Sequence, residues 1–451
     1  MTTLLHTAER LKQGLTTPDE LVAAALVAAR HGAHVFIELF EQRAIEAARA
    51  STQRWRDGTP LSPFDGIPYA VKDLLDVAGT RTTAGSITRL DAPMADADAQ
   101  VIAALNARGM IALGKTNLSE FAYSGLGLNP HFGTPKGDMA VGERRVPGGS
   151  SSGSAIAVQR GIVSCALGTD TAGSIRVPAA FNGVVGYKAS TGRYSMHGVH
   201  PLAVTLDSLG PFARTVADCV ALDAAMRGAA CPAIDPGALS RLRLVVDDAV
   251  LADDALQPAV RHNLLAMMEC LRGAGVQVEH RAVRAVANTR ALIARDGWLG
   301  AIEAWRLLEA IVEGPDGARM DRRVRARLRS AKAIGPGVEA RIRQARDELM
   351  AAIERELDGA LLVMPTVKHV APAMAPLEQD DALFAAVNLQ TLSLTMIGSL
   401  LDMPGVAVPS GTDPAGLPTS VLFSAPQGHD DALLGACLAM ESTLHAAKVR
   451  G

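Results

Sequence analysis

The sequence predicts an α/β fold, with one large domain in which a central mixed β-sheet is covered by α-helices on both faces. Short apolar runs with strand character alternate along the chain with longer segments of helical spacing, the pattern of helices packed on a parallel or mixed sheet. No internal repeat, low-complexity tract or Pro/Ser-rich linker divides the 451 residues. We therefore expect a single domain over residues 1–451.

Composition limits the class of protein. The chain is 48% hydrophobic and 20% charged, as folded globular proteins are, and no window approaches the roughly 18 uninterrupted apolar residues of a membrane span. The formal net charge of −3 provides no field that would gather nucleic acid or anionic lipid, so a small neutral ligand fits better. The early residues are charged and lack the apolar run of a secretory signal, which favours a cytoplasmic protein.

The cysteines support the same compartment. There are five, an odd number in a long chain, and none forms a Cys-x-x-Cys pair, so we expect reduced, buried thiols. They are Cys165, Cys219, Cys231, Cys270 and Cys437.

Capping signals and apolar runs mark the elements in order. Residues 17–20 (TPDE) predict a helix start with a capping box. A short apolar run at 67–71 ends at Lys72, and residues 96–107 have helical spacing. The strand-like segments are 110–113, 163–167, 242–247, 276–279 and 361–364.

Residues 283–357 differ from the rest, because they form long helical patterns dense in arginine. We interpret them as a more variable, mostly helical insertion. An RNA-binding arm is the alternative, but acidic residues are interspersed and no aromatic residue follows Trp305 in this segment. Solvated helix faces are therefore favoured.

Two loops of small residues, 147–154 and 168–174, flank an apolar stretch and form the candidate chemical centre. Glycine and serine allow main-chain N–H groups to converge on one point, which makes an anion-binding concavity without a charged side chain. Such a concavity serves phosphate binding or oxyanion stabilisation. A phosphate-binding P-loop is disfavoured, because Ser154 and Ala155 stand where that motif requires Lys and Ser or Thr. The essential positive charge of the lysine is missing.

A nucleophile elbow is a second alternative for this region. Residues 149–153 satisfy G-x-S-x-G and would make Ser151 the nucleophile. That motif requires a strand directly upstream, whereas the preceding GERRVP is charged and ends in proline. The elbow is therefore disfavoured.

These loops and several other segments resemble the amidase-signature family. The matching segments are GIPYAVKDLLDVAGTRTTAGS (66–86), GKTNLSEFAYSGLGLNPHFGTP (114–135), GGSSSGSA (148–155), GTDTAGSIR (168–176) and the stretch 183–218. The first resembles the family's lysine-bearing segment, the second its substrate loop, and the next two its serine-bearing loops. The resemblance implies the amidase-signature fold and activity on amides.

The resemblance also implies a Lys-Ser-Ser catalytic set. Carried across motif by motif, Lys72 of AVKD corresponds to the catalytic lysine, Ser150 to the bridging serine and Ser174 of TAGS to the nucleophile. Ser150 and Ser174 are 24 positions apart, as the family's pair is, which selects Ser150 over the two serines that follow it. The family holds the bridging serine after a cis peptide, here Gly149–Ser150, and the set uses neither metal nor organic cofactor.

This set is suited to amide hydrolysis. Burial lowers the pKa of a lysine, so a neutral Lys72 can take a proton from Ser150 while Ser150 takes one from Ser174 as it attacks the carbonyl. We expect the oxyanion to be held by main-chain N–H groups of the nucleophile loop. These groups belong to Thr171, Ala172, Gly173 and Ser174.

The resemblance leads to two further expectations, one about Ala172 and one about the loop at residues 121–123. The family usually has glycine where this chain has Ala172, so activity requires that Ala172 adopt a negative φ. By resemblance, Phe121, Ala122 and Tyr123 belong to the loop that lines the acyl pocket, and Tyr123 is the side chain expected to face the substrate.

Neighbouring charged residues are expected to have structural roles. Asp170 and Arg176 should brace the nucleophile loop by a hydrogen bond or ion pair. Asp96 and Asp98 precede a predicted helix, where acids complement the helix dipole, so no metal site is expected there. A Ser-His-Asp set could be drawn from His197, His200 and Asp207. The family needs no histidine, so core or surface roles are favoured for these residues.

We therefore expect an amidase that hydrolyses a small-molecule carboxamide to a carboxylate and ammonia or an amine. The alternative is the glutaminase subunit of an aminoacyl-tRNA amidotransferase, although KGDMAVGERR after Pro135 is unlike its usual pattern. A catalytically silent binding protein is a third hypothesis, motivated by Ala172. The expected partner is a small-molecule amide, with no nucleic acid and no membrane, and a homodimer is left open.

Overall fold

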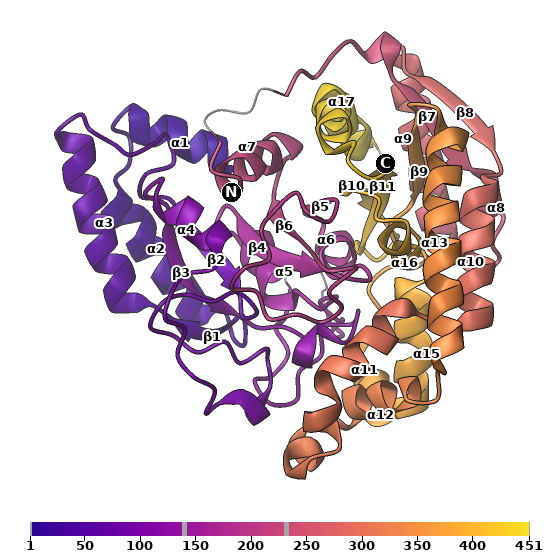
Figure 1. Ribbon diagram of the computed structural model, residues 1–451. Coiled ribbons are helices and arrows are strands. Elements are labelled where there is room, and N and C mark those ends of the chain that lie inside the picture. Colours follow the sequence, from indigo (N-terminus) through magenta and orange to yellow (C-terminus); the bar gives the residue numbers. More distant parts are fainter. Residues whose placement is uncertain (1, 138–141, 230–233, 451) are drawn as a thin grey trace.

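An eleven-stranded mixed sheet runs through the molecule (Figure 1). The computed structural model describes residues 2–137, 142–229 and 234–450, so Cys231 and part of the KGDMAVGERR segment lie outside the described residues. The strand order is β1-β3-β2-β4-β6-β5-β10-β11-β9-β7-β8. The strands are β1 (Phe36–Leu39), β2 (Pro68–Lys72), β3 (Ile111–Thr116), β4 (Ala166–Asp170), β5 (Val185–Lys188), β6 (Ser208–Ala213), β7 (Arg243–Asp247), β8 (Gln277–Arg281), β9 (Leu361–Pro365), β10 (Gly405–Thr412) and β11 (Pro418–Ser424).

Side chains alternate between the two faces of this sheet, and helices cover each face. In β10, Val406 and Val408 pack into one apolar cluster, whereas Ala407 between them packs into another. In β9, Val363 joins the first cluster and Leu362 a cluster on the opposite face. Successive residues of a strand point to opposite faces, so both faces must be covered to bury such runs. The predicted α/β class, with a central mixed sheet covered on both faces, is confirmed.

Most of the helices fall into two groups, one on each face of the sheet. One face is covered by α1 (Leu4–Lys12), α4 (Gln100–Asn106), α7 (Val216–Met226), α9 (Pro258–Gly273) and α17 (Asp430–Arg450). The other is covered by α2 (Pro18–His31), α3 (Glu41–Arg56), α5 (Ser152–Gln159), α6 (Arg176–Asn182), α10 (Arg284–Asp296), α13 (Pro336–Leu357) and α16 (Thr395–Leu400). The remaining α-helices of the described residues are α8 (Asp248–Leu251), α11 (Leu299–Val312), α12 (Arg322–Ala331), α14 (Met374–Gln379) and α15 (Asp381–Leu392). In the described part of the chain, no helix is both long and apolar enough to cross a bilayer.

Local signals in the sequence predicted several helices and strands close to their observed positions. The capping box is present at α2, where Thr17 Oγ1 accepts from Glu20 N and Glu20 Oε2 accepts from Thr17 N. The strands expected at 242–247, 276–279 and 361–364 are β7, β8 and β9. The strand expected at 163–167 begins later, as β4, because Val163 lies in the turn after α5.

The strands without a clear sequence signal lie in the middle of the sheet. β6 contains Gly210 and Pro211, and β10 begins at Gly405 and carries Pro409 beside a break in register. Gly and Pro weaken the propensity of a segment for strand structure. Here the pairing of β6 with β4 and of β10 with β11 overrides that propensity.

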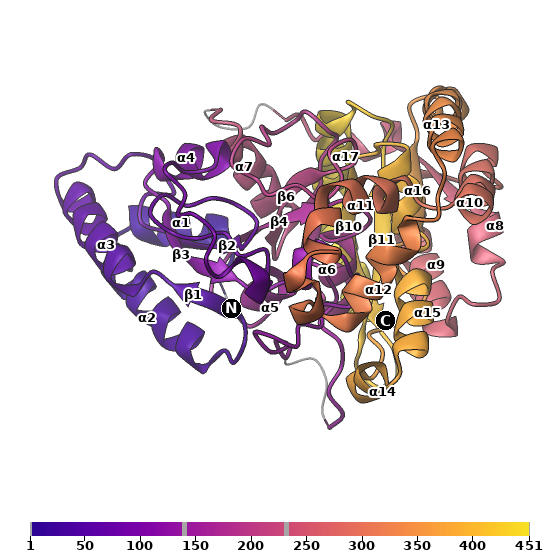
Figure 2. The same cartoon turned by 60° about the horizontal axis from the view of Figure 1, so that its bottom comes forward.

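The arginine-rich segment is helical, and α10 to α13 occupy most of it. Figures 1 and 2 show α12 beside both α11 and α15. The predicted solvated helix faces account for only part of this segment. Arg323 is buried against Asp321, and Arg327 is partly buried in a cavity described below, because α12 packs over the loop that follows β3.

Candidate active site

Lys72 is the last residue of β2, and none of its surface is exposed. Its Nζ lies 2.7 Å from Ser150 Oγ and 2.7 Å from Thr169 Oγ1. Burial lowers the pKa of Lys72 to about 7, although the carboxylates of Asp170 and Asp207 act in the opposite direction. A large fraction of the amine is therefore neutral near neutral pH.

Ser150 lies in a backbone arrangement that excludes side chains at the preceding residue. The peptide bond between Gly149 and Ser150 is cis, as the resemblance implied. A Cβ at Gly149 would lie 2.7 Å from Ser119 Oγ, closer than real Cβ atoms approach. Gly149 N donates to Gly125 O at 2.8 Å, and Ser119 N donates to Ser150 O at 3.1 Å. These contacts hold the Ser150 hydroxyl against Lys72.

The two serines that follow donate to main-chain carbonyls rather than contacting the lysine. Ser151 Oγ donates to Thr169 O at 3.3 Å, and Ser152 Oγ donates to Asn117 O at 3.4 Å. Short hydroxyl side chains often bond to nearby main-chain groups in this way. Of the three consecutive serines, Ser150 is the one at the amine.

Ser174 lies in the turn between β4 and α6, and 4% of the residue is exposed. Ser151 N donates to Ser174 O at 3.3 Å, so the two serine-bearing loops are joined through their main chains. Among the described residues, none of the N–H groups of 171–174 donates to a protein acceptor. N–H groups without a protein acceptor, in a turn that carries a serine, are available as the donors that an oxyanion hole requires.

Glycine is required at position 173 rather than at 172. Gly173 has a φ of 143°, whereas Ala172 is not among the residues with positive φ. A Cβ at Gly173 would lie 2.3 Å from Thr395 Oγ1, and the same hydroxyl donates to Ala172 O at 2.6 Å. Ala172 therefore has the negative φ that activity was expected to require.

Asp170 and Arg176 form a buried ion pair that braces the loop, as expected. Arg176 Nη2 lies 2.8 Å from Asp170 Oδ1, and Nε lies 3.0 Å from Oδ2. Burial would raise the pKa of Asp170, but the Arg176 guanidinium holds it below its ordinary value. Arg176 also donates to Thr395 O and Ser399 Oγ of α16. The pair thus links the nucleophile loop to α16, and neither residue lines the cavity.

Thr169 is a contact of Lys72 that was not expected from the sequence. β2 and β4 pair in parallel, and Thr169 precedes Asp170 in β4, so their side chains point to opposite faces. A strand prediction that reached residue 170 would have placed the Thr169 side chain on the face opposite Asp170. The expected strand at 163–167 ended before Thr169, so this contact was not predicted.

Asp207 and His200 do not form a Ser-His-Asp set. Asp207 Oδ1 accepts from Thr171 Oγ1 at 2.5 Å, and Oδ2 accepts from two loop N–H groups. Burial raises the pKa of Asp207 to about 6. Burial also lowers the pKa of His200 to about 4, and its ring packs 6.1 Å from the Phe121 ring. The contacts of Asp207 fix the nucleophile loop instead.

Ser174 lines a cavity of about 230 Å³ with mostly apolar walls. Ala122 and Tyr123, which the resemblance places in the loop at the acyl pocket, also line this cavity. Phe121 does not, because its backbone is left-handed, with a φ of 49°, and its ring packs against His200. Other lining residues are Ser124, Thr171, Ala172, Leu202, Trp298, Arg327, Asn388 and Met396.

Two polar residues of the cavity were not predicted individually from the sequence. Arg327 lies on α12 and Asn388 on α15. Asn388 Oδ1 accepts from Ser124 Oγ at 3.0 Å and from Gly125 N at 2.8 Å, which fixes the loop beside the cis peptide. Neither residue belongs to a local motif, so only the tertiary packing reveals them.

A larger hollow of about 720 Å³ lies between α1, α3 and α7. No residue of either serine-bearing loop lines it, so the smaller cavity is the candidate active site. Within the described residues, no group of three or more His, Cys, Asp or Glu side chains is placed to hold a metal ion. Ser174 and two other loop residues with free N–H groups, Thr171 and Ala172, line the cavity. Lys72 and Ser150 are not among its lining residues. Together, a base, two serine hydroxyls and free N–H donors are the groups that acyl transfer requires.

Comparison with known proteins agrees with this chemistry. A family model described as Amidase matches residues 20–434. A 2-amino-5-chloromuconic acid deaminase of Comamonas testosteroni is 32% identical, over 94% of this chain and 93% of that protein. One subunit of the glutamyl-tRNA(Gln) amidotransferase of Ralstonia nicotianae is 44% identical, over 45% of this chain and 40% of that protein. A crystal structure described as an amidase superposes with a TM-score of 0.86 at 29% identity, covering 99% of both chains.

Proposed function

The chain belongs to the amidase family and hydrolyses carbon–nitrogen bonds other than peptide bonds, and from this premise we propose that it cleaves a small-molecule carboxamide through a Ser174 acyl-enzyme. Lys72 and Ser150 form the proton relay, and the N–H groups of Thr171, Ala172, Gly173 and Ser174 bind the oxyanion. The products are a carboxylate and ammonia or an amine.

Acylation begins with neutral Lys72. Its amine takes the proton of Ser150 while Ser150 takes the proton of Ser174, and Ser174 Oγ attacks the amide carbon. The carbonyl oxygen becomes an oxyanion that accepts hydrogen bonds from the free N–H groups of the loop. Such a donor is worth about 10²–10³ in rate when it is aimed at the developing charge.

Collapse of the tetrahedral intermediate breaks the carbon–nitrogen bond. The departing nitrogen receives the proton of Ser150, which is replenished from Lys72, and the acyl group stays on Ser174 Oγ. Water then attacks the ester, giving its proton to the same relay, and the carboxylate leaves as Ser174 regains its hydrogen. Lys72 and both serines end each cycle in their starting states.

The observation that carries this proposal is the 2.7 Å contact between the buried Lys72 amine and Ser150 Oγ. The test is covalent labelling with a small uncharged fluorophosphonate, followed by mass spectrometry of the labelled peptide. Labelling of Ser174 that disappears in Ser174→Ala, together with loss of ammonia release from amides, is the expected result. Amide hydrolysis that survives in Ser174→Ala would contradict the proposal, and an unlabelled, inactive wild type would favour a silent binding protein.

The glutaminase subunit of an aminoacyl-tRNA amidotransferase is the second candidate. The 44% identity to such a protein over part of the chain favours it. A free-standing amidase is supported by the relative that matches along nearly the whole chain, whose name describes a deaminase of a small acid. The purified chain should release ammonia from simple amides without a partner protein. Activity restricted to glutamine and dependent on an added partner would favour the second candidate.

A cytoplasmic location is part of the same proposal. Cys165, Cys219, Cys270 and Cys437 are unpaired in the structure, which fits a reducing compartment. A homodimer is compatible with the function but is not needed by it, because the residues of the proposed relay and the described cavity lining come from one chain.

A further inference from the structure

Arg327 is the one charged residue among the described residues that line the cavity at Ser174. It comes from α12, and its Nη1 donates to Tyr123 O at 2.5 Å. Its guanidinium carbon lies 4.7 Å from the centroid of the Tyr123 ring. The main-chain contact and the aromatic face hold the guanidinium in one orientation at the cavity wall.

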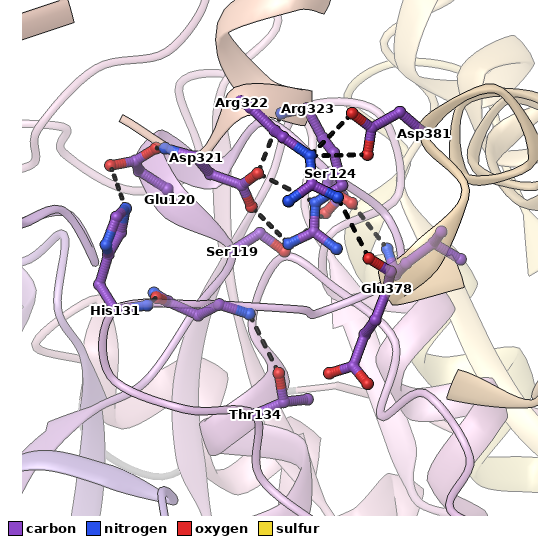
Figure 3. Close-up of polar contacts among 12 residues, drawn as sticks. Ser119, Glu120, Ser124, His131, Thr134, Asp321, Arg322, Arg323, Glu378 and Asp381 are labelled. Carbon is purple, nitrogen blue, oxygen red and sulfur yellow. Dashed lines mark hydrogen bonds and ion pairs between the residues drawn. The ribbon is translucent and has the colours of Figure 1, made fainter. Parts of the chain in front are cut away.

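Three other arginines of α12 have acidic partners, whereas Arg325 and Arg327 have none among the described residues. The pairs are Arg322–Asp381 at 2.8 Å, Arg323–Asp321 at 2.7 Å and Arg329–Glu313 at 3.2 Å. Figure 3 shows the first two of these pairs beside the loop that follows β3. For Arg327, no carboxylate of the described residues lies within ion-pair distance, and the cavity lining contains neither Asp nor Glu.

A guanidinium without an anion is unfavourable in such surroundings. The walls around Arg327 are mostly apolar, and burial lowers its pKa below the ordinary value. Tyr123 satisfies one donor, whereas Nε and Nη2 have no acceptor among the described residues. An arginine presents its donors as a planar fork that matches both oxygens of a carboxylate. The missing counter-ion is therefore expected to arrive with the ligand.

The position of Arg327 relative to the substrate loop is fixed by a buried network. Asp321, the N-cap of α12, accepts from Arg323 N, while its own N–H donates to Glu120 Oε2 at 2.6 Å. Glu120 directly precedes the loop residues 121–123 and also accepts a hydrogen bond from Ser86 Oγ at 2.7 Å. Figure 3 shows Glu120, Asp321 and Arg323 in this arrangement, with His131 on the far side of Glu120. The helix that carries Arg327 and the loop that carries Tyr123 are thus tied together.

We propose that Arg327 binds a carboxylate of the substrate, so that the preferred substrates are monoamides of small dicarboxylic acids or related amides with one carboxylate. The inference rests on the proposed function at Ser174, since both residues line the same cavity. A single guanidinium among apolar walls fits one negative charge. The apolar side chains of Leu202, Trp298 and Met396 are available to contact the carbon chain between the carboxylate and the amide.

The test compares two amides of nearly equal shape. One is the monoamide of a five-carbon dicarboxylic acid, and the other is the neutral amide in which an isopropyl group replaces the carboxylate. Ammonia release gives kcat/KM for both in the wild type, Arg327→Met and Arg327→Lys. Arg329→Met is the matched control, because Arg329 lies on the same helix, is half-exposed and pairs with Glu313 away from the cavity.

The wild type should favour the acidic amide by about 10- to 100-fold in kcat/KM, the range expected for hydrogen bonds to a charged group. Arg327→Met should abolish that preference, Arg327→Lys should keep a part of it, and Arg329→Met should keep all of it. Fluorophosphonate labelling of Ser174 reports whether each variant retains a folded site. Equal use of both amides by the wild type, or a preference unchanged in both Arg327 variants, would overturn the inference. Failure of the proposed function is seen separately, as hydrolysis of either amide by Ser174→Ala.

Discussion

Lys72 Nζ and Ser150 Oγ lie 2.7 Å apart at the end of β2, and neither residue is exposed. In the proposed mechanism, the amine and the hydroxyl act as one proton-transfer unit. The amine serves as a base only when it is neutral, and burial lowers the pKa of Lys72 to about 7. The protonation state of this one residue should therefore control the rate.

The first prediction is the pH dependence of activity. Lys72 is protonated and inactive below its pKa and neutral above it, so kcat/KM should rise through an apparent pKa of about 7 and then level off. Rates on a neutral amide between about pH 5 and about pH 9 test this. Lys72→Met should lower kcat by about 10²–10⁴-fold and remove the rise. A wild-type rate that is constant across this range would contradict the assignment of Lys72 as the base.

The second prediction concerns stability, and its sign follows from the same shift. Between about pH 7 and pH 10.5, Lys72 binds a proton in the unfolded chain but not in the folded one, so its contribution to stability rises with pH. Each pH unit inside this window adds up to about 1.4 kcal/mol. Urea unfolding at several pH values should show the free energy of unfolding of the wild type rising relative to Lys72→Met. A difference that is independent of pH would mean that the pKa of Lys72 is not depressed in the folded protein.

The third prediction separates the serines. Ser174→Ala should abolish both labelling and turnover, and Ser150→Ala should lower kcat by about 10²–10⁴-fold while leaving a slow nucleophile in place. Ser151→Ala is the control, because Ser151 Oγ donates to the main-chain oxygen of Thr169 rather than to Lys72 or Ser174. Loss of this hydroxyl should reduce the rate by less than about tenfold. If Ser151→Ala were as inactive as Ser150→Ala, the nucleophile elbow would have to be reconsidered.

The residues of the candidate site that could be predicted from the sequence belong to local motifs. Lys72, Ser150 and Ser174 stand in short segments whose order and spacing are distinctive, and the structure joins Lys72 to Ser150 across 78 positions of the chain. The Asp170–Arg176 brace was also expected, because both residues flank the nucleophile loop. Local capping at Thr17 and the apolar runs of β7 and β9 likewise reflect forces that act within a few residues.

The rest of the site depends on packing that a single sequence does not display. Arg327 is one of many arginines in its segment, and only the placement of α12 over Tyr123 distinguishes it. Asn388 reaches the site from α15. Phe121 was expected to belong to the loop that lines the pocket, but its ring packs against His200. The cause is its left-handed backbone, which the motif does not reveal. Side-chain direction is set by backbone conformation, which a motif alone does not specify.

The fourth prediction concerns the oxyanion loop. Gly173→Ala places a methyl group 2.3 Å from Thr395 Oγ1 on a residue with a φ of 143°, so the loop must move. Loss of alignment of even one N–H donor should lower kcat by about 10²–10³-fold with a smaller change in KM. Ala172→Gly is the matched control and should stay within about tenfold of the wild type, since Ala172 already has a negative φ. Equal effects of the two substitutions would argue against the special role of position 173.

The final prediction tests the buried ion pair behind the loop. Arg176→Met leaves the Asp170 carboxylate buried without its cation, which should lower the free energy of unfolding by about 3–5 kcal/mol. Adding Asp170→Asn to Arg176→Met should recover part of this loss, because no unpaired charge remains. The exposed pair of Arg30 and Glu41 is the control, and Arg30→Met should lower stability far less than Arg176→Met, because water screens an exposed ion pair. The measurement is the free energy of unfolding in urea. It is compared among the wild type, the two single variants at the buried pair, their double variant and Arg30→Met. A double variant whose loss of stability equals the sum of the two single losses would show that Asp170 and Arg176 do not act as a pair.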